Sequence, residues 1–235
     1  MRRMGDGWRK TETSFMIDQK HISIYPGSSS SAPVLYVNTI EEEGEELYHT
    51  VRDISQMDFS LVTISGLVWE HDLSPWENLP IIPNGLAFTK GADDYIQFLL
   101  ERILPGAETW LGGLPVWRAL AGYSLAGLFA VYSLYHTAIF SRVASISGSL
   151  WFPGFREYVL SHKMKRRPDC IYFSLGSKES KTRNPFLKSV QQKTEELEAI
   201  YRGQGIDTAF VRNPGNHYTE PVRRTARGLA WLLSK

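Results

Sequence analysis

The sequence contains one cysteine, almost no net charge and no long apolar run, and each of these absences excludes a class of protein. Its 26 Lys and Arg residues and 25 Asp and Glu residues leave a formal net charge of +1 in 235 residues. There is therefore no general electrostatic attraction to nucleic acid. No stretch approaches the ~20 apolar residues that a membrane-spanning helix needs. We expect neither a nucleic acid nor a membrane as a partner.

The single cysteine and the N-terminus indicate the cellular compartment. Cys170 cannot form an intramolecular disulfide, which fits a reducing compartment. Its apolar surroundings, CIYFSL, favour a buried and unreactive thiol over a nucleophile. The basic N-terminal stretch 1–15 is not followed by the apolar run of a signal peptide. The sequence thus predicts a cytoplasmic protein.

The apolar runs that are present predict a doubly wound α/β fold. PVLYVNTI, at 33–40, is nearly continuous, which is typical of a strand buried on both faces of a parallel sheet. Similar runs occur at 59–67, 116–124, 142–149, 170–176 and 207–215, and helical patterns lie between most of them, with clear helices expected at 93–104, 184–205 and 221–235. Two shorter alternating runs, 13–18 and 21–27, predict an antiparallel hairpin at the N-terminus. No repeat or linker divides the chain, so we expect one domain over residues 1–235.

The tract 66–91 is too long for an ordinary connection and shows no helical periodicity. Long irregular loops inside compact domains are usually functional. This Trp- and Pro-containing tract is therefore predicted to form a lid or one wall of a pocket.

Ser124 lies in the stretch RALAGYSLAGLFAVYSLY, between a strand-like run and an apolar helical run. A nucleophilic serine on a sharp strand-to-helix turn needs small residues two positions before and two after it. Here these residues are Gly122 and Ala126, and Gly127 allows close packing of helix and sheet. The context favours Ser124 as a nucleophile over a purely structural turn.

A serine nucleophile needs a base, and usually an acid that orients the base. In the α/β-hydrolase arrangement these follow in the chain order Ser, acid, His, each after a strand. Glu179 follows the strand at 170–176, and His217 follows the strand at 207–215. We predict them as acid and base; Glu220 and Asp207 are weaker candidates for the acid.

The remaining histidines compete poorly for the role of base. His21, His49, His136 and His162 lie in hairpin, helical or basic surface stretches. His71 belongs to the 66–91 tract but precedes the serine, so substrate contact or a role in loop structure is expected for it. Glu70, His71 and Asp72 are adjacent, and adjacent side chains on a strand point to opposite faces. We therefore expect no metal site.

The oxyanion of an acyl-transfer reaction needs backbone donors. The N–H of Leu125, at the start of the helix after Ser124, is the first candidate. The second is expected in the loop after the strand at 33–40, where we nominate the N–H of Ile40, with Thr39 next. Trp69, Trp76, Trp151 and Phe152 are predicted either to line the substrate pocket or to pack in the core. If they line the pocket, they favour an aryl or bulky acyl substrate.

Four blocks of the chain, RALAGYSLAGLFAVY, SGSLWFPG, YFSLGSKESKTRNP and NPGNHY, resemble the putative esterase group of the α/β-hydrolase superfamily. This group contains siderophore trilactone esterases and related carboxylesterases. Its members usually carry GHSLGG at the elbow, whereas here Tyr123 replaces His and Ala126 replaces Gly; we count Tyr123 among the substrate contacts. The resemblance implies an α/β-hydrolase fold and acyl transfer to water through an acyl-enzyme. In some members a Ser–His dyad suffices, which supports Ser124 and His217 more than Glu179.

Three functions remain open from the sequence, and a peptidase is a fourth, although the chain lacks the extra domain that is common in peptidases of this fold. The first is a serine esterase that cleaves small-molecule carboxylic esters, including siderophore-type esters. The second is an acyltransferase or thioesterase that uses the same triad. The third is a binding protein on a hydrolase scaffold, which the presence of all three triad partners disfavours. None of these needs a cofactor, and the sequence leaves the oligomeric state open.

Overall fold

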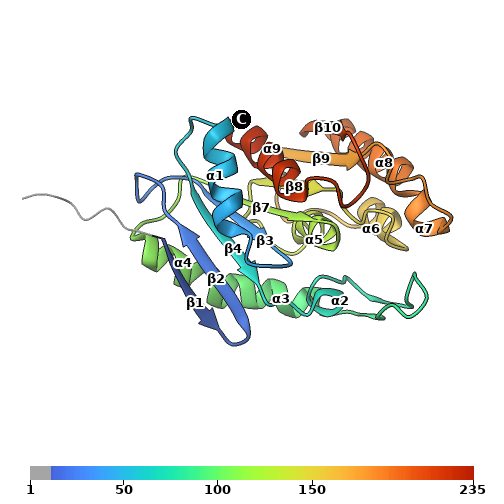
Figure 1. Ribbon diagram of the computed structural model, residues 1–235, viewed down its shortest axis with the longest axis horizontal. Coiled ribbons are helices and arrows are strands. Elements are labelled where there is room, and N and C mark those ends of the chain that lie inside the picture. The colour runs from blue at the N-terminus through green and yellow to red at the C-terminus, as the bar shows by residue number, and fades with distance from the viewer. Residues whose placement is uncertain (1–11) are drawn as a thin grey trace, which may run out of the picture.

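The computed structural model describes residues 12–235, so the signal-peptide prediction for the N-terminal stretch falls largely outside the described residues. Within them, eight strands form one sheet in the order β1-β2-β4-β3-β7-β8-β9-β10 (Figure 1). The strands are β1 (Thr13–Ile17), β2 (Lys20–Tyr25), β3 (Val34–Asn38), β4 (Ser60–Ser65), β7 (Arg118–Tyr123), β8 (Arg142–Ile146), β9 (Cys170–Gly176) and β10 (Asp207–Asn213).

The sheet has an antiparallel edge and a parallel body. β1 pairs antiparallel with β2, and β2 pairs antiparallel with β4, so the predicted N-terminal hairpin is confirmed. From β4 through β3, β7, β8 and β9 to β10, all neighbouring strands are parallel. Every residue of β3, β4, β8 and β9 is buried, as their continuous apolar runs predict. Their carboxyl ends therefore meet at one edge of the sheet.

Helices cover both faces of the sheet, which makes the fold doubly wound. The helices are α1 (Gly44–Ile54), α3 (Ala92–Phe98), α4 (Leu104–Leu111), α5 (Leu125–Ser133), α6 (Phe155–Ser161), α7 (Pro185–Lys188), α8 (Val190–Gly203) and α9 (Pro221–Leu233). α1 and α9 pack side by side on one face (Figure 1). α3, α4, α5, α6 and α8 contribute their apolar side chains to the core on the other face. All residues of α5 are buried, because this helix lies in the middle of that layer.

The helix predicted at 93–104 is longer than its pattern suggested, because α3 and α4 are joined by a π-helical segment, Leu99–Ile103. Pro105 lies two residues after this segment. Proline lacks an N–H and collides with the carbonyl group four residues earlier, so a locally widened turn lets the helix continue past it. The sequence pattern ended at Leu104, but the helix ends at Gly112, which has φ +79°.

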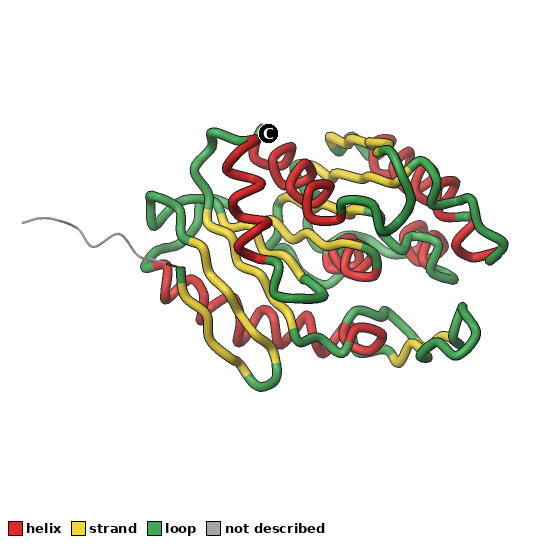
Figure 2. The backbone as a smooth tube through the Cα atoms, viewed as in Figure 1, coloured by secondary structure: helices red, strands yellow, loops and turns green. Residues whose placement is uncertain are grey.

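The tract 66–91 is less irregular than predicted. It contains the short helix α2 (Trp69–Asp72) and a two-stranded ribbon of β5 (Glu77–Asn78) and β6 (Phe88–Thr89). Figure 2 shows the tract, mostly loop, reaching out at the end of the molecule where α7 lies. The ribbon was missed because two-residue strands leave no readable alternation in the sequence.

Two further features concern the thiol of Cys170 and the possibility of a membrane-spanning helix. Cys170 is 1% exposed, and burial raises the pKa of its thiol to about 12, so it stays protonated and unreactive. Across residues 12–235, none of the helices combines the length and the apolar character that crossing a bilayer requires.

Candidate active site

Ser124 occupies the sharp turn between β7 and α5. Its backbone has φ 57° and ψ −121°, a left-handed conformation that L-residues rarely adopt. Such strain costs about 1–3 kcal/mol and persists only where the surrounding structure imposes it. It is typical of a side chain that must project at the edge of a sheet.

Steric contacts explain why the residues around Ser124 are small. A Cβ atom on Gly122 would lie 2.4 Å from Cβ of Ala126, and one on Gly127 would lie 2.9 Å from the carbonyl oxygen of Gly122. Both contacts are shorter than non-bonded carbon atoms allow, so neither glycine can carry a side chain while α5 stays this close to β7. The sequence pattern thus reflects the close approach of helix and strand.

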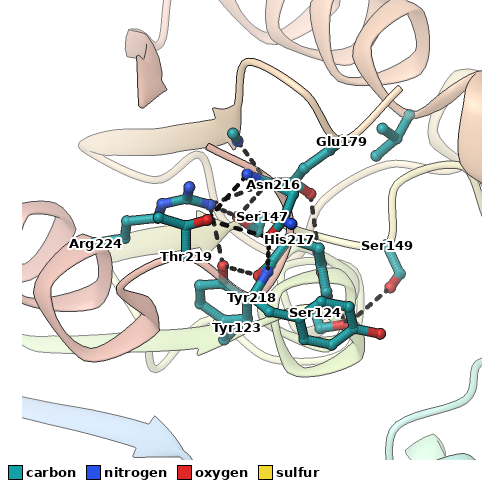
Figure 3. Close-up of polar contacts among 12 residues, drawn as sticks. Tyr123, Ser124, Ser147, Ser149, Glu179, Asn216, His217, Tyr218, Thr219 and Arg224 are labelled. Atoms are coloured by element: carbon teal, nitrogen blue, oxygen red, sulfur yellow. Dashed lines mark hydrogen bonds and ion pairs between the residues drawn. The ribbon is translucent and has the colours of Figure 1, made fainter. Parts of the chain in front are cut away.

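Three side chains from three loops form one hydrogen-bonded line (Figure 3). Nε2 of His217 lies 3.1 Å from Oγ of Ser124, and Nδ1 of His217 lies 2.8 Å from Oε2 of Glu179. Glu179 follows β9 and His217 follows β10, so the parallel strands bring both to the edge where β7 delivers Ser124. This is the geometry in which a carboxylate orients an imidazole toward a hydroxyl.

Glu179 is held as an anion. Its side chain is 4% exposed, and burial by itself raises the pKa of a carboxyl group. The hydrogen bonds that it accepts from His217, from the N–H of Gly176 and from the hydroxyl of Ser147 outweigh burial, so the pKa of Glu179 is lower than usual. A carboxylate that stays ionised can stabilise a positive charge on His217.

A cavity of about 480 Å³ opens beside Ser124. Its walls are mostly apolar, and Trp69, Phe88, Trp151 and Tyr218 are aromatic residues that line it. The 66–91 tract supplies one wall, as predicted. Its other lining groups include Lys178 and Lys181, from the segment that carries Glu179. The cavity is large enough for a small organic molecule.

Of the aromatic residues for which the sequence left pocket lining and core packing open, Trp69 and Trp151 line the cavity, whereas Trp76 does not. The indole ring of Trp76 packs against Phe152 and Tyr158, with ring centroids 5.7 and 5.5 Å away, and its N–H donates to the carbonyl oxygen of Pro153 at 2.9 Å. Phe152 is likewise buried, at 2% exposed. These two aromatic side chains hold the 66–91 tract against α6, which is core packing and not substrate contact.

His71 lies outside the cavity lining as well. Its Nδ1 is 2.8 Å from the hydroxyl of Thr89, so it ties α2 to the β5–β6 ribbon. Its neighbour Asp72 accepts from Nζ of Lys20 at 2.8 Å, while Glu70 lines the cavity. In the described part of the chain, no three His, Cys, Asp or Glu side chains gather in a way that could hold a metal ion.

Tyr123 was expected to contact substrate, but it lies behind the triad and not on the cavity wall. Its hydroxyl donates to the backbone carbonyl oxygen of His217 at 2.5 Å, and its ring centroid is 5.3 Å from that of His217. Because β7 side chains alternate between the two faces of the sheet, Tyr123 points away from the pocket while Ser124 points into it.

One of the two nominated oxyanion donors is in position. Leu125 lines the cavity, and its N–H, at the first position of α5, has no hydrogen-bond partner within residues 12–235. Ile40 is 63% exposed and does not line the cavity. The N–H of Thr39 is bonded to the carbonyl oxygen of Ile64 at 2.9 Å, which removes it from this role. This bond extends the pairing of β3 with β4 by one residue, so the loop after β3 turns away from the cavity.

The sequence reasoning missed Ser147, Ser149 and Arg224. Ser147 donates to Oε1 of Glu179 at 2.7 Å, and Oγ of Ser149 lies 3.4 Å from Oγ of Ser124. Both follow β8 at the same sheet edge as the triad, which was a usable indication. Arg224 stands four residues before Gly228 on the buried face of α9, and a charged residue in a helix rich in arginine gives no sign of this burial in the sequence.

Comparisons with known proteins identify a family and solved structures of similar fold. The family described as Putative esterase matches residues 85–223, which is more than half of the chain. YbbA of Bacillus subtilis strain 168, whose full name is "Uncharacterized protein YbbA", is 21% identical over 227 residues, which cover 90% of this chain and 89% of that protein.

Solved structures share the fold at low identity. The siderophore hydrolase EstA from Aspergillus nidulans is 17% identical with a TM-score of 0.72, over 100% of this chain and 98% of that one. An IroE-like serine hydrolase from Shewanella oneidensis is 18% identical with a TM-score of 0.75, over 95% of this chain and 79% of that one.

The chain thus has the α/β-hydrolase fold. Within that class, the chain belongs to the putative esterase family.

Proposed function

We propose that this protein is a serine esterase that cleaves small-molecule carboxylic esters, with Ser124 as nucleophile, His217 as general base and Glu179 as orienting acid. The observation that carries the proposal is the continuous line of hydrogen bonds from Glu179 through His217 to Oγ of Ser124. A hydroxyl is a weak nucleophile until a base can take its proton, and this line supplies the base and its orientation.

The reaction follows from the positions of the atoms. Oγ of Ser124 attacks the ester carbonyl while its proton passes to Nε2 of His217, and the negative charge on the carbonyl oxygen is stabilised by the N–H of Leu125. The proton on Nε2 then passes to the departing alkoxide, which leaves as an alcohol and leaves an acyl group on Ser124. A water molecule then gives a proton to His217 and attacks the acyl carbon. As the bond to Oγ of Ser124 breaks, His217 returns this proton to Oγ, which releases the acid and regenerates the serine.

The cavity favours esters with a bulky or aromatic acyl group. Trp69 and Trp151 offer flat apolar faces beside Ser124. Two of the similar structures are siderophore hydrolases by name, which makes siderophore-type esters the first natural substrates to try. We extend the proposal to that substrate class.

The test is labelling with a fluorophosphonate, which reacts with an activated serine and reports the site by peptide mass. We expect one adduct on Ser124 in the wild type and in Ser149→Ala, and none in Ser124→Ala. The Ser149→Ala variant is the matched control, because its hydroxyl is the neighbouring serine at 3.4 Å. An adduct on Ser149, or none on folded wild-type protein, would overturn the proposal.

A panel of aryl and trilactone esters then defines the substrate, and the acceptor is tested in the same assay. Release of free acid that is unchanged by added alcohol or thiol supports hydrolysis. Diversion of the acyl group to the added acceptor would identify an acyltransferase instead.

A further inference from the structure

Arg224 is the largest side chain that is almost fully buried, at 1% exposed. A buried guanidinium group is costly unless its donors are satisfied. Nη1 of Arg224 donates to Oε1 of Glu179 at 3.3 Å, to Oγ of Ser147 at 3.3 Å and to the hydroxyl of Tyr123 at 3.2 Å. Nη2 donates to the carbonyl oxygen of Pro214 at 2.7 Å.

These four acceptors belong to the four strand ends that build the site. Tyr123 ends β7 directly before Ser124, and Ser147 follows β8. Glu179 follows β9, and Pro214 follows β10 three residues before His217. One guanidinium group therefore joins the elbow, the acid loop and the histidine loop.

Tyr123 extends this connection to the base. Its hydroxyl accepts from Arg224 and donates to the carbonyl oxygen of His217 at 2.5 Å. Burial raises the pKa of Tyr123, so the phenol keeps the proton that it donates. The backbone of His217 is thereby fixed from behind while its ring faces Ser124.

We propose that Arg224 and Tyr123 are positioning residues of the triad: Arg224 holds the Glu179 carboxylate toward His217, and the Tyr123 hydroxyl, held by Arg224, fixes the backbone of His217. Neither residue lines the cavity, so both act through the triad and not on the substrate. The inference rests on the proposed function, because it concerns the machinery of the same site.

Arg224 also sets the charge that His217 experiences. Oε1 of Glu179 faces Arg224, and Oε2 faces His217, so one carboxylate lies between two groups that carry or can carry positive charge. Removing Arg224 leaves Glu179 with one positive neighbour fewer, so its attraction for a positive charge on His217 becomes stronger.

The other titratable groups around His217 are the same in the wild type and in a variant that lacks Arg224. Lys178, Lys181, Tyr218 and Glu70 face it from the cavity, and Tyr123 faces it from β7. On α9, Arg223 and Glu220 pair with each other at the surface, at 3.2 Å.

The experiment measures the rate of fluorophosphonate labelling, and kcat/KM for p-nitrophenyl acetate, from pH 5 to 9. For Arg224→Met we expect a loss of about 100-fold, since small displacements of catalytic groups cost this much. We also expect the midpoint of the acidic limb to rise by about one pH unit. Arg224→Lys should restore the midpoint and only part of the rate, because a lysine keeps the charge but not the planar fork.

Tyr123→Phe removes one hydroxyl and keeps the ring, so it tests the second connection with little risk to folding. We expect its rate to fall about tenfold with the acidic midpoint unchanged, because the charges around His217 are the same. Arg223→Met, at the adjacent and exposed position of α9, is the matched control and should behave as the wild type.

The outcomes separate this inference from the proposed function. If the wild type is not labelled, the proposed function fails and the inference fails with it. If the wild type is labelled, and folded Arg224→Met keeps the wild-type rate and pH profile, only the inference is overturned. If Arg224→Met does not fold, Tyr123→Phe decides: a tenfold loss supports the inference, and a wild-type rate overturns it.

Discussion

Nε2 of His217 lies 3.1 Å from Oγ of Ser124, although 93 residues separate the two in the chain. Nδ1 of the same ring is bonded to Glu179 at 2.8 Å, so the imidazole bridges a hydroxyl and a carboxylate. Nε2 is thus placed to take the proton of Ser124, while Nδ1 is held by the carboxylate of Glu179.

Replacing His217 by alanine should remove the base and leave the fold intact, because the ring stands on a loop at the edge of the sheet. We expect kcat/KM for p-nitrophenyl esters to fall by about 10⁴-fold or more. His49→Ala is the control, since His49 is exposed on α1. Wild-type activity in His217→Ala would remove this residue from the mechanism.

The lowered pKa of Glu179 predicts how the free energy of unfolding depends on pH. Its folded-state pKa is lowered, chiefly because its hydrogen bonds outweigh the effect of burial, so the stability it contributes is present above the unfolded-state pKa of about 4.3. It is lost as the pH falls through the folded-state value.

The measurement is urea unfolding of the wild type and Glu179→Gln between pH 3 and 7. The difference in free energy of unfolding should be constant above about pH 5.5 and should shrink on acidification below about pH 4. A difference that grows with acidification would contradict the assignment of Glu179 as a stabilised anion.

Ser149 places a second hydroxyl 3.4 Å from Oγ of Ser124, on the cavity wall. Its side chain has room to donate to the charge that develops on the substrate, a contact that is stronger in the transition state than in the ground state. We expect Ser149→Ala to lower kcat about tenfold with KM little changed. Ser133→Ala, in the buried part of α5, controls for the loss of a hydroxyl. Equal kcat values in Ser149→Ala and the wild type would leave Ser149 without a catalytic role.

Trp151 and Trp76 give opposite expectations for the same substitution. Trp151 lines the cavity, so Trp151→Ala should raise KM for esters with an aromatic acyl group more than for esters with an acetyl group. Trp76 holds the 66–91 tract against α6, so Trp76→Ala should lower the free energy of unfolding by about 3 kcal/mol and leave the ratio of the two KM values unchanged. A change of substrate preference in Trp76→Ala would contradict this distinction.

Local patterns in the sequence determined the fold class and the triad geometry. The apolar runs of β3, β8 and β9 are long enough to be buried on both faces, which requires parallel strands with covering helices. Gly122, Ser124 and Ala126 describe a turn that can be read from five residues. Because parallel strands end at one edge, the positions of Glu179 and His217 after their strands were enough to bring them toward Ser124.

Only the tertiary structure decided which neighbours these residues have. Trp76 and Trp151 are alike in sequence, and the packing of the 66–91 tract against α6 sends one to the core and the other to the cavity. Arg224 carries a charge on a helix with exposed arginines, and its burial follows from the way α9 crosses the ends of four strands. Residues that are close in the chain determine the local backbone conformation. The partners of a side chain depend on how segments that are distant in the chain pack together, and no short stretch of sequence contains that information.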